Sequence, residues 1–337
     1  MAYDGKVMRR ALQQFEKDKR QREDRFQERR ESIFRRQPRL KEIDNELRST
    51  MSRIIASALR HGTDPVPAVE VLREENLRLQ TEKRELLTRM GLPVDCLDEK
   101  PACVLCGDTG YQGARVCRCL RNYYAREQQK ELSRMLDLGN QSFDTFSLQW
   151  YSDHVEAGQK KSARSHMEEK VYNSCADYAH RFGRRPENLL LFGAPGLGKT
   201  HLSAAIAREV SKEGWSVVYD TAAHVFERFE TQKFGRDEGE EAASDVERVL
   251  TCDLLILDDL GTEMSTPFVQ SALYQIVNTR LMEKRSTIIS TNLTPEKIAQ
   301  RYSPQIASRI EGEYQLLPFV GEDIRKLKKE RGTFDGL

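Results

Sequence analysis

Short apolar runs separated by amphipathic stretches mark the chain from residue 140 onward. These runs are LLLF (189–192), VVY (217–219), LLIL (254–257), TIIS (287–290) and QLLPF (315–319). Strands that are apolar along their length, alternating with helical segments, are typical of a parallel sheet covered by helices on both faces. The pattern therefore predicts an α/β fold with a five-stranded parallel sheet.

The amino-terminal third has a different, helical pattern. Apolar residues at steps of three and four predict an amphipathic helix, and they are Leu40, Ile43, Leu47, Met51, Ile54, Ile55 and Leu59. Leu72, Leu79 and Leu86 predict a second helix, but polar positions between them favour a helical hairpin over an extended coiled coil. We therefore divide the sequence into a charged helical region (1–95), a cysteine-containing module with a following helix (96–138) and an α/β domain (139–337).

Composition narrows the class of protein. The 54 basic residues nearly balance the 53 acidic ones, which argues against a polybasic protein that coats DNA but leaves a local basic groove possible. No apolar stretch approaches the ~20 residues of a membrane span, and the first residues lack the apolar core of a signal peptide. We expect a cytoplasmic protein that makes no membrane contact.

The segment GAPGLGKT contains the complete phosphate-loop pattern G-x-x-x-x-G-K-[ST] between an apolar strand and a helix. Its glycines let backbone N–H groups point at phosphate oxygens, and the helix amino terminus adds positive charge. We expect Lys199 to reach the β- and γ-phosphates and the Thr200 hydroxyl to bind Mg²⁺. The predicted nucleotide-contacting residues are Gly193, Ala194, Pro195, Gly196, Leu197, Gly198, Lys199, Thr200 and His201.

Two aspartates directly follow the apolar run LLIL. They lie at the carboxyl end of the predicted strand, which is the end at which ligands bind in open α/β sheets. We expect Asp258 to hold Mg²⁺, directly or through water, and Asp259 to polarise an attacking water. Asn292 follows the next strand, where an amide would orient that water or sense the γ-phosphate, although Asn after a strand is often only a turn residue. Together with the phosphate loop, this arrangement predicts a Mg²⁺-dependent ATPase.

Four of the seven cysteines lie close together, in the pattern C-x₂-C followed by C-x-C. Cys103, Cys106, Cys117 and Cys119 supply four soft thiolates that suit a structural, tetrahedral zinc ion. A redox dithiol and an iron–sulfur cluster are the alternatives. We expect Cys96, Cys175 and Cys252, which are isolated in the sequence, to be inert.

The motifs GAPGLGKTHL, CDLLILDDLG, NTRLMEKRSTIISTNL, IASRIEGE and GEDIRK, in this order, resemble the DnaC/DnaI/IstB clade of AAA+ ATPases over roughly residues 140–330. The resemblance implies ATP as the nucleotide, Arg309 as an arginine finger acting in trans, and Arg325 as a sensor arginine within its own subunit. A finger acting in trans implies self-association through the AAA+ domain. Asp259 replaces the Glu of many AAA+ proteins, as in the DnaI and IstB branches, which implies slower hydrolysis.

The cysteine module, which follows the charged helices in the sequence, resembles the amino-terminal region of DnaI-type helicase loaders and is unlike IstB. This resemblance implies an ATP-dependent loader that places a hexameric replicative helicase, gripped by the amino-terminal domain, on single-stranded DNA during chromosome replication. The alternatives are an IstB-like ATPase helper of a DNA transposase, or an adaptor switched by nucleotide with negligible turnover. The ATPase motifs suit all three functions.

Overall fold

The computed structural model describes residues 3–58, 66–136, 141–155, 158, 160–235 and 239–332. It divides the chain into two compact units. We call residues 1–12 with 118–337 the α/β unit, and residues 13–117 the helical unit. Among the described residues, no helix combines the length and the apolar character needed to cross a bilayer.

The α/β unit contains a five-stranded sheet in which every pair of neighbours is parallel, as the apolar runs predict. The strands are β3 (Leu189–Phe192), β4 (Val217–Thr221), β5 (Leu254–Leu260), β6 (Ser286–Thr291) and β7 (Gln315–Pro318). Their order is β4-β5-β6-β3-β7, so the two strands expected to supply the acidic pair and the polar amide lie beside each other. Most strand residues are buried, because helices cover both faces.

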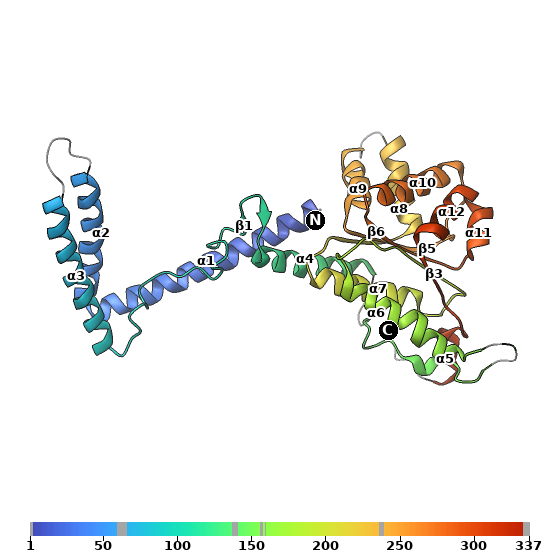
Figure 1. Ribbon diagram of the computed structural model, residues 1–337, viewed down its shortest axis with the longest axis horizontal. Helices are drawn as coiled ribbons and strands as arrows, with labels where there is room; N and C mark the ends of the chain where they lie inside the picture. Colours follow the sequence, from blue (N-terminus) through green and yellow to red (C-terminus); the bar gives the residue numbers. More distant parts are fainter. Residues whose placement is uncertain are drawn as a thin grey trace. The chain divides into compact units, whose positions relative to one another are not determined.

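Helices α8, α9, α10, α11 and α12 pack on one face of the sheet and α6 and α7 on the other (Figure 1). The helical segments of this unit, besides the start of α1, are α4 (Arg118–Leu136), η1 (Leu148–Trp150), α5 (Ala163–His166), η2 (Met167–Tyr172), α6 (Asn173–Arg181), α7 (Lys199–Lys212), α8 (Ala222–Phe234), α9 (Gly239–Thr251), α10 (Pro267–Met282), α11 (Pro295–Arg301), α12 (Pro304–Glu313) and α13 (Ile324–Glu330). Helices α10 and α12 both begin with a hydroxyl cap followed by proline, since Thr266 and Ser303 accept backbone N–H groups of the first turn.

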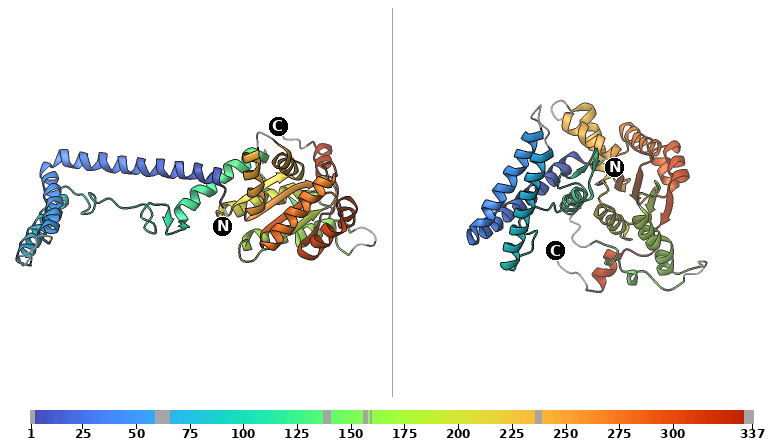
Figure 2. Two further views of the ribbon diagram at one scale, coloured as in Figure 1. Left: turned by 90° about the horizontal axis from the view of Figure 1, so that it is seen from above. Right: turned by 60° about the vertical axis from the view of Figure 1, so that its left-hand side comes forward.

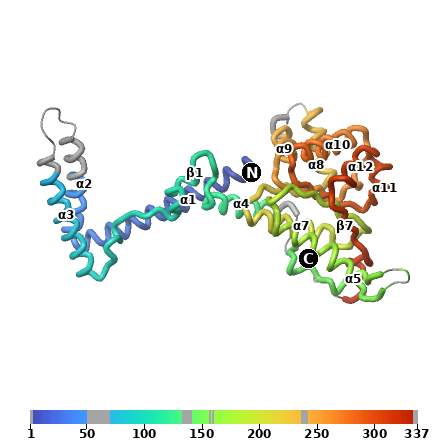
Figure 3. Tube along the Cα trace, viewed as in Figure 1, coloured from blue at the N-terminus to red at the C-terminus, as the bar shows by residue number. Residues whose placement is uncertain are grey.

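The helical unit contains residues 13–36 of α1 (Gly5–Arg36), α2 (Pro38–Ala58), α3 (Val66–Arg89) and the short strands β1 (Tyr111–Gln112) and β2 (Arg115–Val116). Helices α2 and α3 lie side by side, as the predicted hairpin requires (Figures 2 and 3). Leu40 and Leu87 are fully buried in the small core at the base of this pair. Charged residues occupy 18 of the 32 positions of α1 and 10 of the 24 positions of α3, so the described part of this unit buries little apolar surface.

A buried arginine joins three elements of the α/β unit. Arg280, in α10, has no exposed surface, and it donates hydrogen bonds to the carbonyls of Val249 (2.8 Å), Cys252 (3.0 Å) and Ser286 (2.6 Å) and to the hydroxyl of Thr287 (2.9 Å). The carbonyls at the end of a helix have no partner within it. Arg280 thus caps α9 and fixes where β5 and β6 begin.

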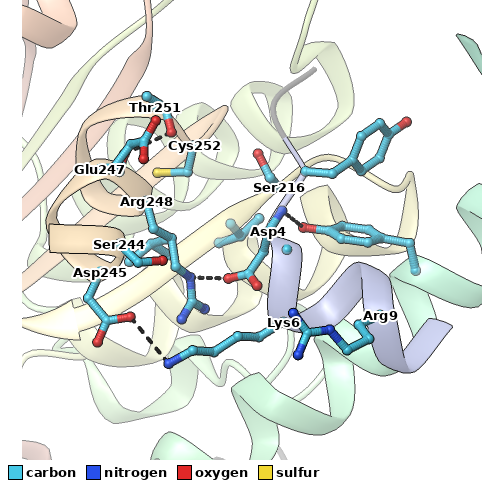
Figure 4. A pocket seen from close by; sticks show the side chains of 15 residues that line it. Asp4, Lys6, Arg9, Ser216, Ser244, Asp245, Glu247, Arg248, Thr251 and Cys252 are labelled. Atoms are coloured by element: carbon cyan, nitrogen blue, oxygen red, sulfur yellow. Dashed lines mark hydrogen bonds and ion pairs between the residues drawn. The ribbon is translucent and has the colours of Figure 1, made fainter. Parts of the chain in front are cut away.

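The first turn of α1 packs on the rest of the α/β unit, beside the starts of β4 and β5 (Figure 4). The Asp4 carboxylate pairs with Arg248 of α9, whose guanidinium also donates to Glu131 of α4 at 3.0 Å. The Tyr124 hydroxyl accepts the Asp4 backbone N–H at 3.0 Å. Asp4 also accepts the backbone N–H of Val7 at 2.9 Å, and therefore caps the helix while it holds the arginine.

We expect the substitution Arg280→Met to lower the free energy of unfolding by about 3 kcal/mol or more, because several buried carbonyls lose a charged donor. Chemical denaturation of the full chain measures the loss. Arg181→Met is the control, since Arg181 is exposed and, within the described residues, bonds only the Asp177 carbonyl of its own helix. An equal effect of both substitutions would contradict the role given to Arg280.

We expect Asp4→Asn to destabilise the protein by about 1–3 kcal/mol, because it leaves half-buried Arg248 with one carboxylate fewer. Asparagine still caps a helix, so Asp4→Ala should cost about 1 kcal/mol more. Thermal unfolding of both variants separates the ion pair from the cap. An Asp4→Asn protein as stable as the wild type would show that the pair contributes nothing.

Candidate nucleotide-binding site

The phosphate loop connects the end of β3 to α7. Gly193, Gly196 and Gly198 have φ values of 144°, 77° and 84°, which side chains rarely adopt. Space is also short, because a Cβ at Gly196 would lie 2.0 Å from a carboxylate oxygen of Asp323. The loop therefore requires glycine at these positions, and it ends at the amino terminus of α7, which favours anions.

Lys199 lies inside this loop with 5% of its surface exposed. Its Nζ donates to the carbonyls of Gly193 and Ala194 and to Oδ1 of Asn292, each at 2.8 Å. Burial lowers the pKa of Lys199, and the nearby carboxylates of Asp259 and Asp258 oppose that shift. The structure thus brings Lys199 and Asn292 together, although they are far apart in the sequence.

Asp258 is a buried carboxylate at the end of β5, with 4% of its surface exposed. Its Oδ1 accepts from Thr200 at 3.4 Å and from Ser290, and its Oδ2 accepts from Tyr219 at 2.8 Å. Hard oxygen donors of this kind are the ligands that Mg²⁺ prefers. The hydroxyl of Thr200 and the carboxylate of Asp258 therefore fit a magnesium ion next to the phosphate loop.

Asp259 lies at an irregularity in the sheet. The register of β5 against β6 shifts between Leu257 and Leu260, and Asp259 has a φ of 53°. Bulges of this kind re-aim side chains, and left-handed backbone at a residue other than glycine is common at functional sites. Burial raises the pKa of Asp259, the charge of Asp258 raises it further, and Lys199 and Arg325 lower it. Asp259 lines the same cavity as Lys199.

The cavity over the phosphate loop has a volume of about 350 Å³. Besides the phosphate loop, it is lined by Gln141, Thr145, Phe146, Ser147, Trp150, Asp259, Thr262, Asn292, Ile324, Arg325 and Lys328, together with Lys199, Thr200 and His201 of α7. Phe146, Trp150, Leu197 and Ile324 give part of this lining the apolar character that a nucleotide base requires.

The segment around Phe146 and Tyr151 supports the phosphate loop, and the sequence patterns did not indicate it. The Tyr151 hydroxyl donates to the Leu197 carbonyl at 2.8 Å, and a Cβ at Gly198 would lie 2.9 Å from the Phe146 ring. His201 bonds the Ser142 carbonyl at 2.9 Å through Nε2, and burial lowers its pKa. These aromatic residues form no recognisable motif, so no signal in one sequence could have found them.

The two arginines that the resemblance singled out lie in different places. Arg325, in the first turn of α13, lines the nucleotide cavity, and its charge lowers the pKa of Asp259. Arg309 is not among the described residues that line it. Its guanidinium lies 5.4 Å from the ring centroid of Tyr274 and donates to that hydroxyl at 3.4 Å. The roles of both arginines stay predictions.

The cysteine cluster is a local feature of residues 103–119. The sulfur atoms of Cys103, Cys106, Cys117 and Cys119 all lie within 4.8 Å of one another. Two thiolates bound to one tetrahedral zinc ion lie about 3.8 Å apart, and the sulfurs of Cys103 and Cys117 are separated by 3.8 Å. The four residues fit zinc.

Cys175 lies outside this cluster. Burial raises the pKa of the Cys175 thiol to about 12, which leaves it protonated and unreactive.

The strand order, the phosphate loop and the acidic pair define the class of the α/β unit, which is a P-loop domain built on a five-stranded parallel sheet. Residues 162–325 match the model of the family described as IstB-like ATP binding protein. This match, which covers slightly less than half of the chain, agrees with the resemblance of the motifs to ATPases of the DnaC/DnaI/IstB type.

Individual relatives match parts of the chain. The replicative helicase loader DnaC of Buchnera aphidicola is 31% identical over 162 residues, which are 47% of this chain and 64% of the relative. A Sinorhizobium fredii protein named as an insertion sequence ATP-binding protein is 34% identical over 105 residues, which are 31% of this chain and 34% of the relative. The chain thus spans less than two thirds of either relative.

A solved structure of the DnaC helicase loader is 22% identical in sequence and has a TM-score of 0.43. The comparison covers 54% of this chain and 98% of the chain in that structure.

We expect the purified protein to contain one zinc ion per chain, measured by elemental analysis, and Cys106→Ser to remove it because a tetrahedral site loses one of its four ligands. Cys96→Ser is the control, since Cys96 lies outside the cluster and should leave the zinc content unchanged. Iron in place of zinc, or a Cys106→Ser protein with full metal content, would contradict the assignment.

Proposed function

We propose that this protein hydrolyses ATP to load a hexameric replicative helicase onto single-stranded DNA during chromosome replication, in the cytoplasm. The observation that supports this proposal best is the cavity over the phosphate loop, in a chain whose relatives include the DnaC helicase loaders. The site brings together Lys199 and Thr200 at the start of α7, Asp258 and Asp259 of β5, and Asn292 directly after β6. The same geometry suits ATP hydrolysis in any member of the family.

In this proposal the backbone of the phosphate loop and Lys199 bind the phosphates of ATP, and Thr200 and Asp258 hold Mg²⁺. The metal, when bound, neutralises charge on the phosphates. Asp259 accepts a proton from the attacking water, and Asn292 orients that water. Arg309 lies on α12, outside the nucleotide cavity of its own chain, which suits a finger that completes the site of a neighbouring subunit.

The helical unit is the part that grips the helicase in this proposal. Its hairpin of α2 and α3 has a small apolar core and many charged side chains. In this proposal the cysteine cluster binds zinc and thereby stabilises residues 103–119. The division into a charged helical region (1–95), a zinc module (96–138) and an ATPase domain (139–337) belongs to the same proposal. The AAA+ domain contacts single-stranded DNA and further copies of the chain.

An IstB-like helper of a DNA transposase is the second candidate. The family description and the relative named as an insertion sequence ATP-binding protein favour it. A nucleotide-switched adaptor with negligible turnover is the third candidate, because the short side chain of Asp259 stands where many AAA+ proteins have Glu.

We expect Asp259→Asn to bind ATP normally and to hydrolyse it at least about 100-fold more slowly, because the amide cannot accept the proton. A tagged, full-length Asp259→Asn protein, held with ATP and Mg²⁺, should therefore retain its partners in a lysate of the source cells. Mass spectrometry of the captured proteins should find the replicative helicase. Lys199→Ala, which cannot bind the phosphates, is the control and should capture much less of it.

Capture of a transposase without the helicase would overturn the loader proposal in favour of the second candidate. Turnover in the wild type that is no faster than in Asp259→Asn would favour the adaptor. Equal capture by the Asp259→Asn and Lys199→Ala proteins would show that binding of the partner does not depend on nucleotide.

A further inference from the structure

The carboxylate of Asp258 is held by hydroxyl groups from both strands that flank β5. Tyr219, in β4, is 1% exposed and donates to Oδ2 at 2.8 Å. Ser290, in β6, donates to Oδ1. An aspartate carboxylate rotates freely about its last torsion unless hydrogen bonds fix it. Its orientation is therefore set from two sides, before any contact with a ligand.

The two ends of the carboxylate differ in their partners. Oδ1 also accepts from Thr200 at 3.4 Å and from the backbone N–H of Asp259 at 3.2 Å. In the part of the chain that the structure describes, Tyr219 is the one hydrogen-bond donor to Oδ2. Tyr219 therefore holds Oδ2 on the side of β4, while Oδ1 lies within reach of the Thr200 hydroxyl that is expected to hold Mg²⁺.

The hydroxyl of Tyr219 also reaches the phosphate-loop helix. Ser203, on α7, lies 2.9 Å from it and 3.1 Å from the carbonyl of Thr200. The phenol has one proton, which goes to the carboxylate because a charged acceptor binds it more strongly. Ser203 then donates its own proton to the phenol oxygen or to the carbonyl. Hydrogen bonds thus connect the acidic strand to the helix that bears Thr200.

A purely structural role would not require this hydroxyl. Phenylalanine would fill the same apolar space, and a buried phenol costs free energy unless it is hydrogen-bonded. Tyr178 shows the structural alternative in the same unit, because it is equally buried and its hydroxyl donates to the backbone carbonyl of Glu187 at 3.2 Å.

We propose that Tyr219 is a positioning residue of the ATPase site, which holds the Asp258 carboxylate in the orientation that binds Mg²⁺. It does not contact the nucleotide itself. The inference rests on the proposed role of Asp258 in holding the metal. Residues that orient a metal ligand commonly change metal affinity by about 10–100-fold when their hydrogen bond is removed.

We expect Tyr219→Phe to raise the Mg²⁺ concentration needed for half-maximal binding of a fluorescent ATP analogue by about tenfold. Affinity for the analogue without Mg²⁺ should stay unchanged, because the phosphate loop is intact. Full-length Tyr178→Phe is the matched control, since it loses an equally buried hydroxyl away from Asp258 and should keep the wild-type Mg²⁺ dependence. Wild-type Mg²⁺ dependence in Tyr219→Phe would overturn the inference.

Thermal unfolding shows whether Tyr219→Phe folds. If it does not fold, a second variant tests the same inference. Ser203→Ala leaves the tyrosine in place but removes a hydroxyl that bonds it, and we expect a shift of about two- to threefold in the same direction. No shift in Ser203→Ala would then overturn the inference. If the wild type itself binds the analogue equally well with and without Mg²⁺, the proposed role of Asp258 fails, and the inference about Tyr219 fails with it.

Discussion

The position of β6 between β3 and β5 is the constraint on which the nucleotide site depends. Because the strands are parallel, the residues that follow each of them meet at one edge of the sheet. Asn292 after β6 can therefore reach Lys199 after β3, and Ser290 within β6 can reach Asp258 in β5. With a different strand order, the same sequence motifs would lie apart in the fold and would not form a site.

The apolar runs predicted the five-stranded sheet, and the phosphate-loop pattern predicted the glycine-rich turn before α7, because each is a local signal. Four consecutive apolar residues indicate a buried strand, and the glycines of the loop fit a backbone that a Cβ would obstruct. Tyr219 and Phe146 could not be predicted in this way. Each looks like an ordinary core or linker aromatic, and its meaning comes from a neighbour brought close by the fold.

The acidic pair shows the same limit within one motif. The sequence predicts two carboxylates at the end of a strand, but not that they would differ in environment. Asp258 is buried among hydroxyls, whereas Asp259 takes a left-handed backbone at a shift in register and lines the cavity. The distance of its carboxylate from a bound phosphate is thus set by the backbone of β5 as well as by the length of the side chain.

The hydrogen bonds of Arg280 join segments that the ribosome makes at different times. The end of α9 and the start of β5 leave the ribosome before α10 does, so their carbonyls have no charged donor at first. The start of β6, which Arg280 also binds, follows later. These carbonyls therefore cannot receive their charged donor until α10 has been made, and a nascent chain that stops before α10 lacks both this donor and Asn292.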